Sequence, residues 1–108
     1  MKVCLIGYGK MGQAIEQQLL KRGHQVSFRL GRTDTSQLEQ SLADSDIAIE
    51  FSSPEAAVQH LKSCFKMQKP VVCGTTGWTE AWDDVQFALK QSDGALIFAS
   101  NFSIGVQL

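Results

Sequence analysis

The most constraining feature of this sequence is a glycine turn of spacing G-x-G-x-x-G at residues 7–12, set between two segments of different periodicity. Residues 2–6 are apolar and rich in β-forming side chains, which predicts a buried strand. Residues 11–19 repeat apolar side chains at helical spacing, and Gly23 is typical of a helix end. Apolar alternation over residues 25–30 predicts a second strand. In this strand–helix–strand context the glycines predict a dinucleotide-binding unit.

Each glycine has a separate role in that interpretation. Gly7 allows a tight turn out of the strand. Gly9 has no Cβ, so a pyrophosphate can approach the helix N-terminus, where free N–H groups and the helix dipole favour anions. Gly12 lets the helix pack closely against the strands. The alternative is a glycine-rich turn that holds no ligand, which the surrounding pattern disfavours.

Length and composition limit the class of protein. The 108 residues suffice for one compact domain but are few for a complete dinucleotide-dependent enzyme. A net charge of −1 gives no electrostatic reason to expect nucleic acid or an anionic membrane as partner. No apolar run reaches the roughly 18 residues of a membrane span, and because Met1 and Lys2 lead directly into the first strand, we expect no signal peptide. We therefore expect a cytoplasmic protein.

The cysteines and histidines predict no metal site. Cys4, Cys64 and Cys73 are scattered and lack C-x-x-C spacing, and two of them fall in expected strands. We interpret all three as small buried apolar side chains. His24 and His60 have no partners at ligand spacing and are expected at the surface.

The segment after the second strand bears on cofactor choice. An NAD site usually has a carboxylate there, about 20 residues beyond the glycines, for the ribose hydroxyls. Here the first carboxylate is Asp34, whereas Arg32, beside Thr33, is suited to hold a 2′-phosphate. The alternative is that Arg29 and Arg32 are solvated loop charges. The sequence favours NADPH over NADH and leaves use of both open.

The rest of the chain continues the alternation of strands and helices. Further strands are expected at 46–51, 70–73 and 95–99, with helices at 36–42, 53–65 and 79–93. Five strands alternating with helices predict an α/β fold, a Rossmann-type doubly wound parallel sheet in a single domain. We expect the strand order 3-2-1-4-5 with right-handed crossovers.

Two expected loops follow strands at their carboxyl ends, where ligands bind in open α/β sheets. Phe51 and Ser52 follow the third strand, and residues 74–77 (GTTG) follow the fourth with two hydroxyls between two glycines. Phe51 is equally compatible with a ligand wall and with the core. Trp78 either covers a ligand or packs, and the sequence leaves both open.

Four segments, taken together, resemble one enzyme family: residues 7–12 (GYGKMG), 50–55 (EFSSPE), 74–77 (GTTG) and 101–105 (NFSIG). The resemblance is to 4-hydroxy-tetrahydrodipicolinate reductase, also called dihydrodipicolinate reductase, an NAD(P)H-dependent enzyme of the diaminopimelate route to lysine. The likeness covers the whole chain in order, and the third and fourth segments are its most specific parts.

The resemblance implies roles for residues in these loops. Gly7, Tyr8, Gly9, Lys10, Met11 and Gly12 would hold the pyrophosphate, and Arg32 would contact the adenosine end. Phe51 and Ser52 would line the wall beside the adenosine and its linkage. Gly74, Thr75 and Thr76 would meet the nicotinamide ribose and carboxamide, with Thr76 also touching substrate, and Ala99, Ser100, Asn101 and Phe102 would complete the nicotinamide pocket.

The resemblance also implies that part of the enzyme lies elsewhere. In this family a second domain carries the basic substrate-binding residues, a histidine-rich motif, a lysine proposed as proton donor and the tetramer contacts, and this sequence has none of them. Hydride transfer needs cofactor and substrate held together with water excluded. We therefore expect residues 1–108 to be the cofactor-binding domain, ending at the domain boundary, with no catalytic residue, inactive alone, and a monomer or weak dimer. The intact enzyme, a homotetramer, would reduce a small cyclic dicarboxylate to tetrahydrodipicolinate.

Other interpretations are weaker. Another NAD(P) reductase, such as a pyrroline-carboxylate reductase, is disfavoured by the 74–77 loop. A regulatory nucleotide-sensing module, like those that gate potassium transport, would usually keep an acid after its second strand and would not stop at the unfinished segment 101–108. A purely structural Rossmann-like domain is disfavoured by two intact ligand loops.

Overall fold

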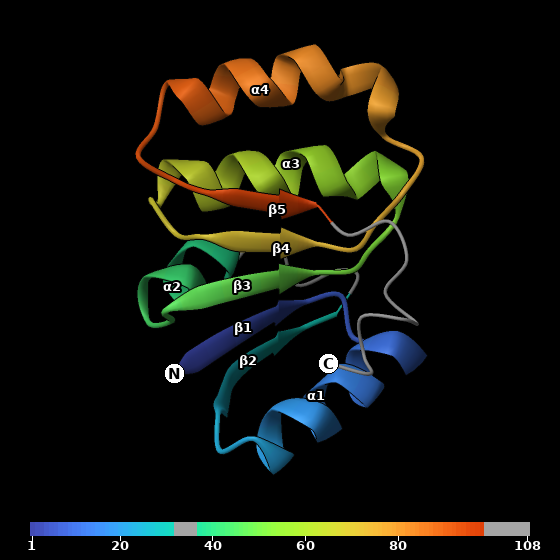
Figure 1. Cartoon of the computed structure of the whole chain (residues 1–108), viewed down its shortest axis with the longest axis vertical. Helices are drawn as coiled ribbons and strands as arrows, with labels where there is room; N and C mark the ends of the chain where they lie inside the picture. The colour runs from blue at the N-terminus through green and yellow to red at the C-terminus, as the bar shows by residue number, and fades with distance from the viewer. Residues whose placement is uncertain (32–36, 99–108) are drawn as a thin grey trace.

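Strands and helices alternate along the chain in the computed structural model, which describes residues 1–31 and 37–98 (Figure 1). The five strands form one sheet, and every neighbouring pair in it is parallel. The predicted α/β fold is therefore confirmed. In chain order the elements are β1 (Lys2–Ile6), α1 (Lys10–Lys21), β2 (Gln25–Leu30), α2 (Leu38–Ala43), β3 (Ile47–Glu50), α3 (Pro54–Lys66), β4 (Val71–Cys73), a 3₁₀ turn (Thr79–Ala81), α4 (Trp82–Lys90) and β5 (Leu96–Phe98).

The strand order is β2-β1-β3-β4-β5, so the predicted order 3-2-1-4-5 is wrong. β3 pairs with β1, from Val3 opposite Ile47 to Ile6 opposite Glu50, instead of lying outside β2. The side chains explain this placement. β2 carries Ser27 and Arg29 between its apolar residues, which suits an edge strand, whereas residues 47–49 are apolar on both faces and suit the sheet interior.

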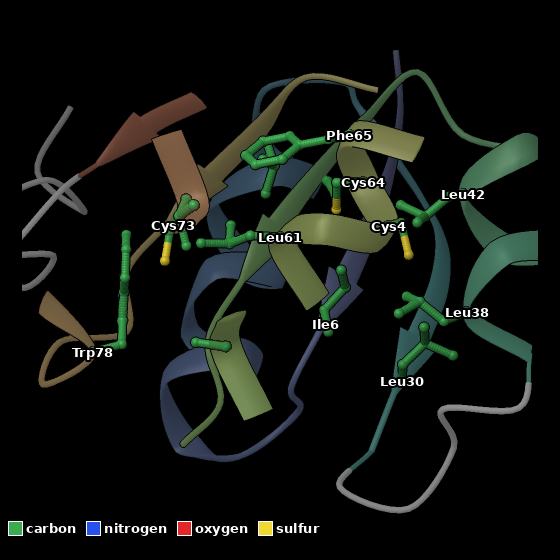
Figure 2. Packing of buried hydrophobic residues seen from close by; sticks show 14 residues of the cluster. Cys4, Ile6, Leu30, Leu38, Leu42, Leu61, Cys64, Phe65, Cys73 and Trp78 are labelled. Carbon is green, nitrogen blue, oxygen red and sulfur yellow. The ribbon is translucent and has the colours of Figure 1, made fainter. Parts of the chain in front are cut away.

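Helices cover the two faces of the sheet unequally. α1 packs on one face through Ile15 and Leu19, against residues of β1, β2 and β3. α2, α3 and α4 pack on the other face, where they enclose the larger cluster of buried side chains (Figures 1 and 2). β2 is added on one side of β1, whereas β3, β4 and β5 are added on the other side, and α1 and α3 cover opposite faces. The winding direction of the sheet therefore changes between β1 and β3, although the strands themselves are parallel.

The three cysteines are buried, as predicted, and lie in the larger cluster (Figure 2). Burial raises the pKa of the Cys4 and Cys73 thiols to about 12, and it raises the pKa of Cys64 as well. Such thiols stay protonated at neutral pH and are poor nucleophiles. They act as small apolar side chains.

The predicted helix boundaries agree closely with the structure. Gly23, with φ of +82°, follows α1, and Ser53 occupies the N-cap of α3 with Pro54 in its first turn. α4 begins at Trp82, later than expected, because residues 79–81 form the 3₁₀ turn. Within the described residues, no helix has the length and apolar character needed to cross a membrane.

Candidate dinucleotide-binding site

A cleft of about 320 Å³ opens between the carboxyl ends of β1 and β3. In open α/β sheets ligands bind outside the carboxyl ends of the strands, at the point where the winding direction changes, and in this strand order that point is between β1 and β3. The cleft is lined by Gly7, Tyr8, Gly9, Gly31, Phe51, Ser52, Ser53, Ala56 and His60. A larger open groove of about 910 Å³ runs along β2 and the amino ends of the strands, away from these loops.

Gly7 makes the turn that closes one end of this cleft. Its φ is +97°, and a Cβ built on it would lie 1.4 Å from the carbonyl oxygen of Phe51. The Gly7 N–H donates to the Leu30 carbonyl at 2.8 Å, and the Phe51 N–H donates to the Ile6 carbonyl at 2.7 Å. Three strand ends therefore meet at a point that only a residue without a side chain can occupy, as the sequence predicts.

Gly9 and Gly12 differ in what surrounds them. Gly9 is the N-cap of α1 in an extended conformation, and a Cβ there would meet no atom within 4 Å. A Cβ at Gly12 would lie 2.7 Å from the Gly7 carbonyl oxygen. Gly12 thus allows close packing against the turn itself rather than against the strands, while Gly9 leaves free space at the helix N-terminus.

The N-terminus of α1 is electrostatically suited to an anion. Lys10 and Met11 in its first turn are exposed, and this turn carries no acidic residue. By contrast, α2, α3 and α4 all have carboxylates in their first turns, where these offset the positive end of the helix dipole. The first N–H groups of a helix have no acceptor within it, so those of α1 are available to an anion in the cleft.

Tyr8 is held at the edge of the cleft by a charged pair. Its hydroxyl donates to Glu16 Oε1 at 2.5 Å, and Arg29 Nε lies 2.8 and 2.9 Å from the two carboxylate oxygens of Glu16. Hydrogen bonding from Arg29, and then from Tyr8, lowers the pKa of Glu16 to about 2. Hydrogen bonding to Glu16 raises the pKa of Tyr8. Arg29 therefore lies in a strand rather than a loop, and its exposed guanidinium is paired with Glu16.

Phe51 and Ser52 lie where the β3–α3 connection borders the cleft. Phe51 is half-buried against the cluster under α1 and also lines the cleft, a position compatible with both of its open interpretations. The Ser52 N–H donates to Thr75 Oγ1 at 2.8 Å. This bond connects the β3–α3 loop to the loop that follows β4.

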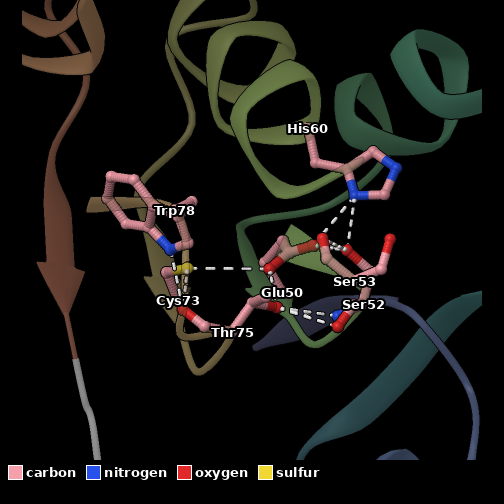
Figure 3. A network of polar contacts seen from close by, with 7 residues as sticks. All are labelled: Glu50, Ser52, Ser53, His60, Cys73, Thr75 and Trp78. Carbon is pink, nitrogen blue, oxygen red and sulfur yellow. Dashed lines mark hydrogen bonds and ion pairs between the residues drawn. The ribbon is translucent and has the colours of Figure 1, made fainter. Parts of the chain in front are cut away.

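Sequence reasoning missed a buried polar network next to the cleft, centred on Glu50 (Figure 3). The Glu50 side chain is completely buried, and its carboxylate accepts from Thr75 Oγ1 at 2.5 Å, from His60 Nδ1 at 2.8 Å and from the Ser52 hydroxyl. The Cys73 Sγ lies 3.6 Å from Glu50 Oε1. His60, expected at the surface, is only 7% exposed, so that prediction is wrong.

Two sequence signals could have revealed this network. Glu50 is a carboxylate inside an otherwise apolar strand segment, where an ionisable group needs partners. His60 shares a helix face with Ala57, Leu61 and Cys64, all of which are buried. The periodicity of this helix therefore indicates a buried His60, although the prediction made from its residue type was an exposed one.

The two threonine hydroxyls of the 74–77 loop differ, because that of Thr75 is hydrogen-bonded in the interior whereas Thr76 is exposed. Thr75 is 5% exposed, with its hydroxyl on Glu50 and its carbonyl oxygen 2.7 Å from the donor Trp78 Nε1. Thr76 is exposed. Trp78 is buried in the larger cluster, and its ring lies 5.7 Å from that of Trp82, so it packs rather than covers a ligand.

Some expected site residues lie outside the described part of the chain. These are Arg32, Ala99, Ser100, Asn101 and Phe102. Over residues 1–31 and 37–98, no group of three histidine, cysteine or acidic side chains is placed to hold a metal ion.

Known proteins match this chain over most of its length. A family model described as dihydrodipicolinate reductase, N-terminus, matches residues 1–102. The 4-hydroxy-tetrahydrodipicolinate reductase of Christiangramia forsetii is 42% identical over 108 residues, which is 100% of this chain and 45% of that protein. The reductase of Neisseria gonorrhoeae is 35% identical over 82% of this chain and 33% of that protein.

A solved structure shows the same fold. The dipicolinate-bound dihydrodipicolinate reductase from a Paenisporosarcina species matches with a TM-score of 0.78 and 19% identity, over 97% of this chain and 49% of that one. The chain spans less than half the length of the curated relatives it matches.

Proposed function

The chain belongs to the family of dihydrodipicolinate reductases, also called 4-hydroxy-tetrahydrodipicolinate reductases, and from this premise we propose that it forms the part of such an enzyme that binds NAD(P)H. The observation that carries the proposal is the free space at Gly9, where the uncompensated N-terminus of α1 opens on the cleft between β1 and β3. A pyrophosphate needs that combination of close backbone approach, free N–H groups and positive helix dipole.

The residues around the cleft fit a dinucleotide. The pyrophosphate would lie on Gly9 and on the first N–H groups of α1, between the glycine turn and the Phe51–Ser52 wall. The exposed Thr76 would face the nicotinamide half and the substrate, while the buried Thr75 supports the loop from behind. The bound cofactor supplies hydride, and the residues of this chain bind and orient it.

We assign the preference for NADPH to Arg32. Of the two arginines in segment 28–33, Arg29 is engaged by Glu16, which leaves Arg32 for a 2′-phosphate. A guanidinium binds phosphate through parallel hydrogen bonds, so this arrangement favours NADPH over NADH.

The remaining parts of the proposal concern the whole enzyme. The substrate is a small cyclic dicarboxylate, in line with the dipicolinate in the Paenisporosarcina relative, and the product is tetrahydrodipicolinate. Residues 1–108 would be the cofactor-binding domain, inactive alone. The substrate site and the contacts of a cytoplasmic homotetramer would then belong to a second domain, which the greater length of the relatives supports.

The experiment is a calorimetric titration of the chain with NADPH and with NADH, repeated on Gly9→Ala. Alanine at this position meets no neighbour, so the fold should be unchanged, but its methyl group would occupy the space that the pyrophosphate needs. We expect NADPH affinity to fall about tenfold or more. Gln17→Ala, at an exposed position further along α1, is the matched control and should bind as the wild type does. Absence of binding by the folded wild type, or equal binding by Gly9→Ala, would contradict the proposal.

A further inference from the structure

Glu50 is a completely buried carboxylate at the carboxyl end of β3, and neither the glycine turn nor the cofactor contacts proposed above use it. Burying a carboxylate costs free energy unless donors surround it. Glu50 has such donors on both oxygens, with Thr75 on Oε1 and with His60 and Ser52 on Oε2 (Figure 3).

These donors come from the two loops that border the proposed cofactor site. Ser52 belongs to the β3–α3 loop beside the glycine turn, and Thr75 belongs to the loop after β4. Thr75 Oγ1 donates to Glu50 and accepts from the Ser52 N–H at 2.8 Å, so it uses both its donor and its acceptor on this network. One carboxylate therefore bridges side chains of the two loops, alongside the direct bond from Ser52 to Thr75 and the 2.8 Å bond from the Gly74 N–H to the Glu50 carbonyl.

The network also reaches the wall of the cleft. Ser52 and His60 both line it, although His60 is held on its other side by Glu50. A carboxylate that served only to fill the core would be replaceable by an apolar side chain, often without loss of stability. A network that ends at the cleft is better explained by the need to hold cleft-lining groups in place.

We propose that Glu50 is a positioning residue that holds the 74–77 loop at the distance from the glycine turn that an intact NAD(P)H spans. This inference rests on the proposed cofactor binding, and it adds that Glu50 acts through Ser52 and Thr75 without touching the cofactor. Removing it should therefore weaken the binding of the nicotinamide half and spare the adenosine and phosphate half.

The test compares two ligands on Glu50→Gln, a change that keeps the size of the side chain. The amide has one acceptor oxygen, so either Thr75 on one side, or Ser52 and His60 on the other, would face a donor in place of an acceptor. We expect NADPH affinity to fall about tenfold, as for one buried polar group left unsatisfied. Affinity for 2′-phospho-ADP-ribose, which lacks the nicotinamide, should change less than about twofold.

Thr75 supplies a matched pair of variants. Thr75→Val keeps the shape, removes the hydroxyl and should reproduce the selective loss of NADPH affinity, whereas Thr75→Ser keeps the hydroxyl and should retain more NADPH affinity than Thr75→Val. If Glu50→Gln fails to fold, this pair decides the question. Equal losses for both ligands, or no loss in Thr75→Val, would overturn the inference.

A second measurement does not depend on the cofactor. In amide NMR spectra of the ligand-free chain, Glu50→Gln should shift the Ser52 and 74–77 signals and speed their hydrogen exchange, and leave α1 unchanged. If the wild type binds no cofactor, the proposed function fails, and these spectra still decide whether Glu50 positions the two loops. Unchanged Ser52 and 74–77 signals would refute the positioning role.

Discussion

Replacing Gly7 by alanine should greatly lower the free energy of unfolding, because the residue combines a positive φ with a close backbone contact. The φ of +97° costs an L-residue about 1–2 kcal/mol. The new Cβ would lie 1.4 Å from the Phe51 carbonyl oxygen, and ordinary contact begins at 3.4 Å, so the turn and the end of β3 must separate by about 2 Å. That movement would break the 2.8 Å bond from Gly7 to Leu30 and the 2.7 Å bond from Phe51 to Ile6.

At about 1 kcal/mol for each bond, the total loss for Gly7→Ala is about 3–4 kcal/mol. A domain of this size has about 5–15 kcal/mol of stability in total, so the loss is a large share of it. Urea unfolding followed by tryptophan fluorescence measures it, since Trp78 is buried in the core. Gly9→Ala is the control and should change the free energy of unfolding by less than about 0.5 kcal/mol, because its Cβ meets free space. A Gly7→Ala protein within about 1 kcal/mol of the wild type at equal m-value would refute this reasoning.

Three further predictions follow from the charges and thiols. Arg29 and Tyr8 lower the pKa of Glu16 from 4.5 to about 2, so the ionised Glu16 stabilises the fold fully above pH 4.5 and loses that effect as the pH falls toward 2. The difference in unfolding free energy between wild type and Glu16→Gln should therefore shrink over that interval, and a constant difference would contradict the prediction. Arg32→Ala should reduce NADPH affinity toward that for NADH in calorimetry, and an unchanged ratio would make Arg32 a bystander. The three buried cysteines, with raised thiol pKa values, should react with a thiol reagent at pH 7.5 only after unfolding in urea, whereas rapid labelling of the native protein would contradict their burial.

The sequence was sufficient for the local units of the fold because their signals are local. The glycine turn, the Ser53–Pro54 helix start and the apolar periods each act over a few residues. The order of the strands is a long-range property, and local patterns indicate it only indirectly, through the polar residues Ser27 and Arg29 of the edge strand β2. The predicted order 3-2-1-4-5 is the one typical of dinucleotide-binding sheets, and it does not take these two polar residues into account.

The Glu50 network was missed for a related reason. Residue type alone suggests that a histidine or glutamate is exposed, and the pairing that makes burial favourable joins residues 10 to 25 positions apart. Such pairing becomes visible only once β3 and β4 are known to be neighbours, with Glu50 opposite Cys73. The geometry of the glycine turn was therefore predictable, because one segment supplies it, whereas that of the Glu50 network, which three segments share, was not.

The observed strand order also determines which loops can border the proposed cofactor site. In the order 3-2-1-4-5, β3 would lie at the outer edge beyond β2, and Phe51 would be two strands away from the glycine turn. In the observed order β3 adjoins both β1 and β4, so the β3–α3 loop lies between the glycine turn and the 74–77 loop. A dinucleotide bound as proposed, from α1 to Thr76, would pass along Phe51 and Ser52, which line the cleft. The central position of β3 is thus the reason that one carboxylate at its end, Glu50, can bond to both neighbouring loops.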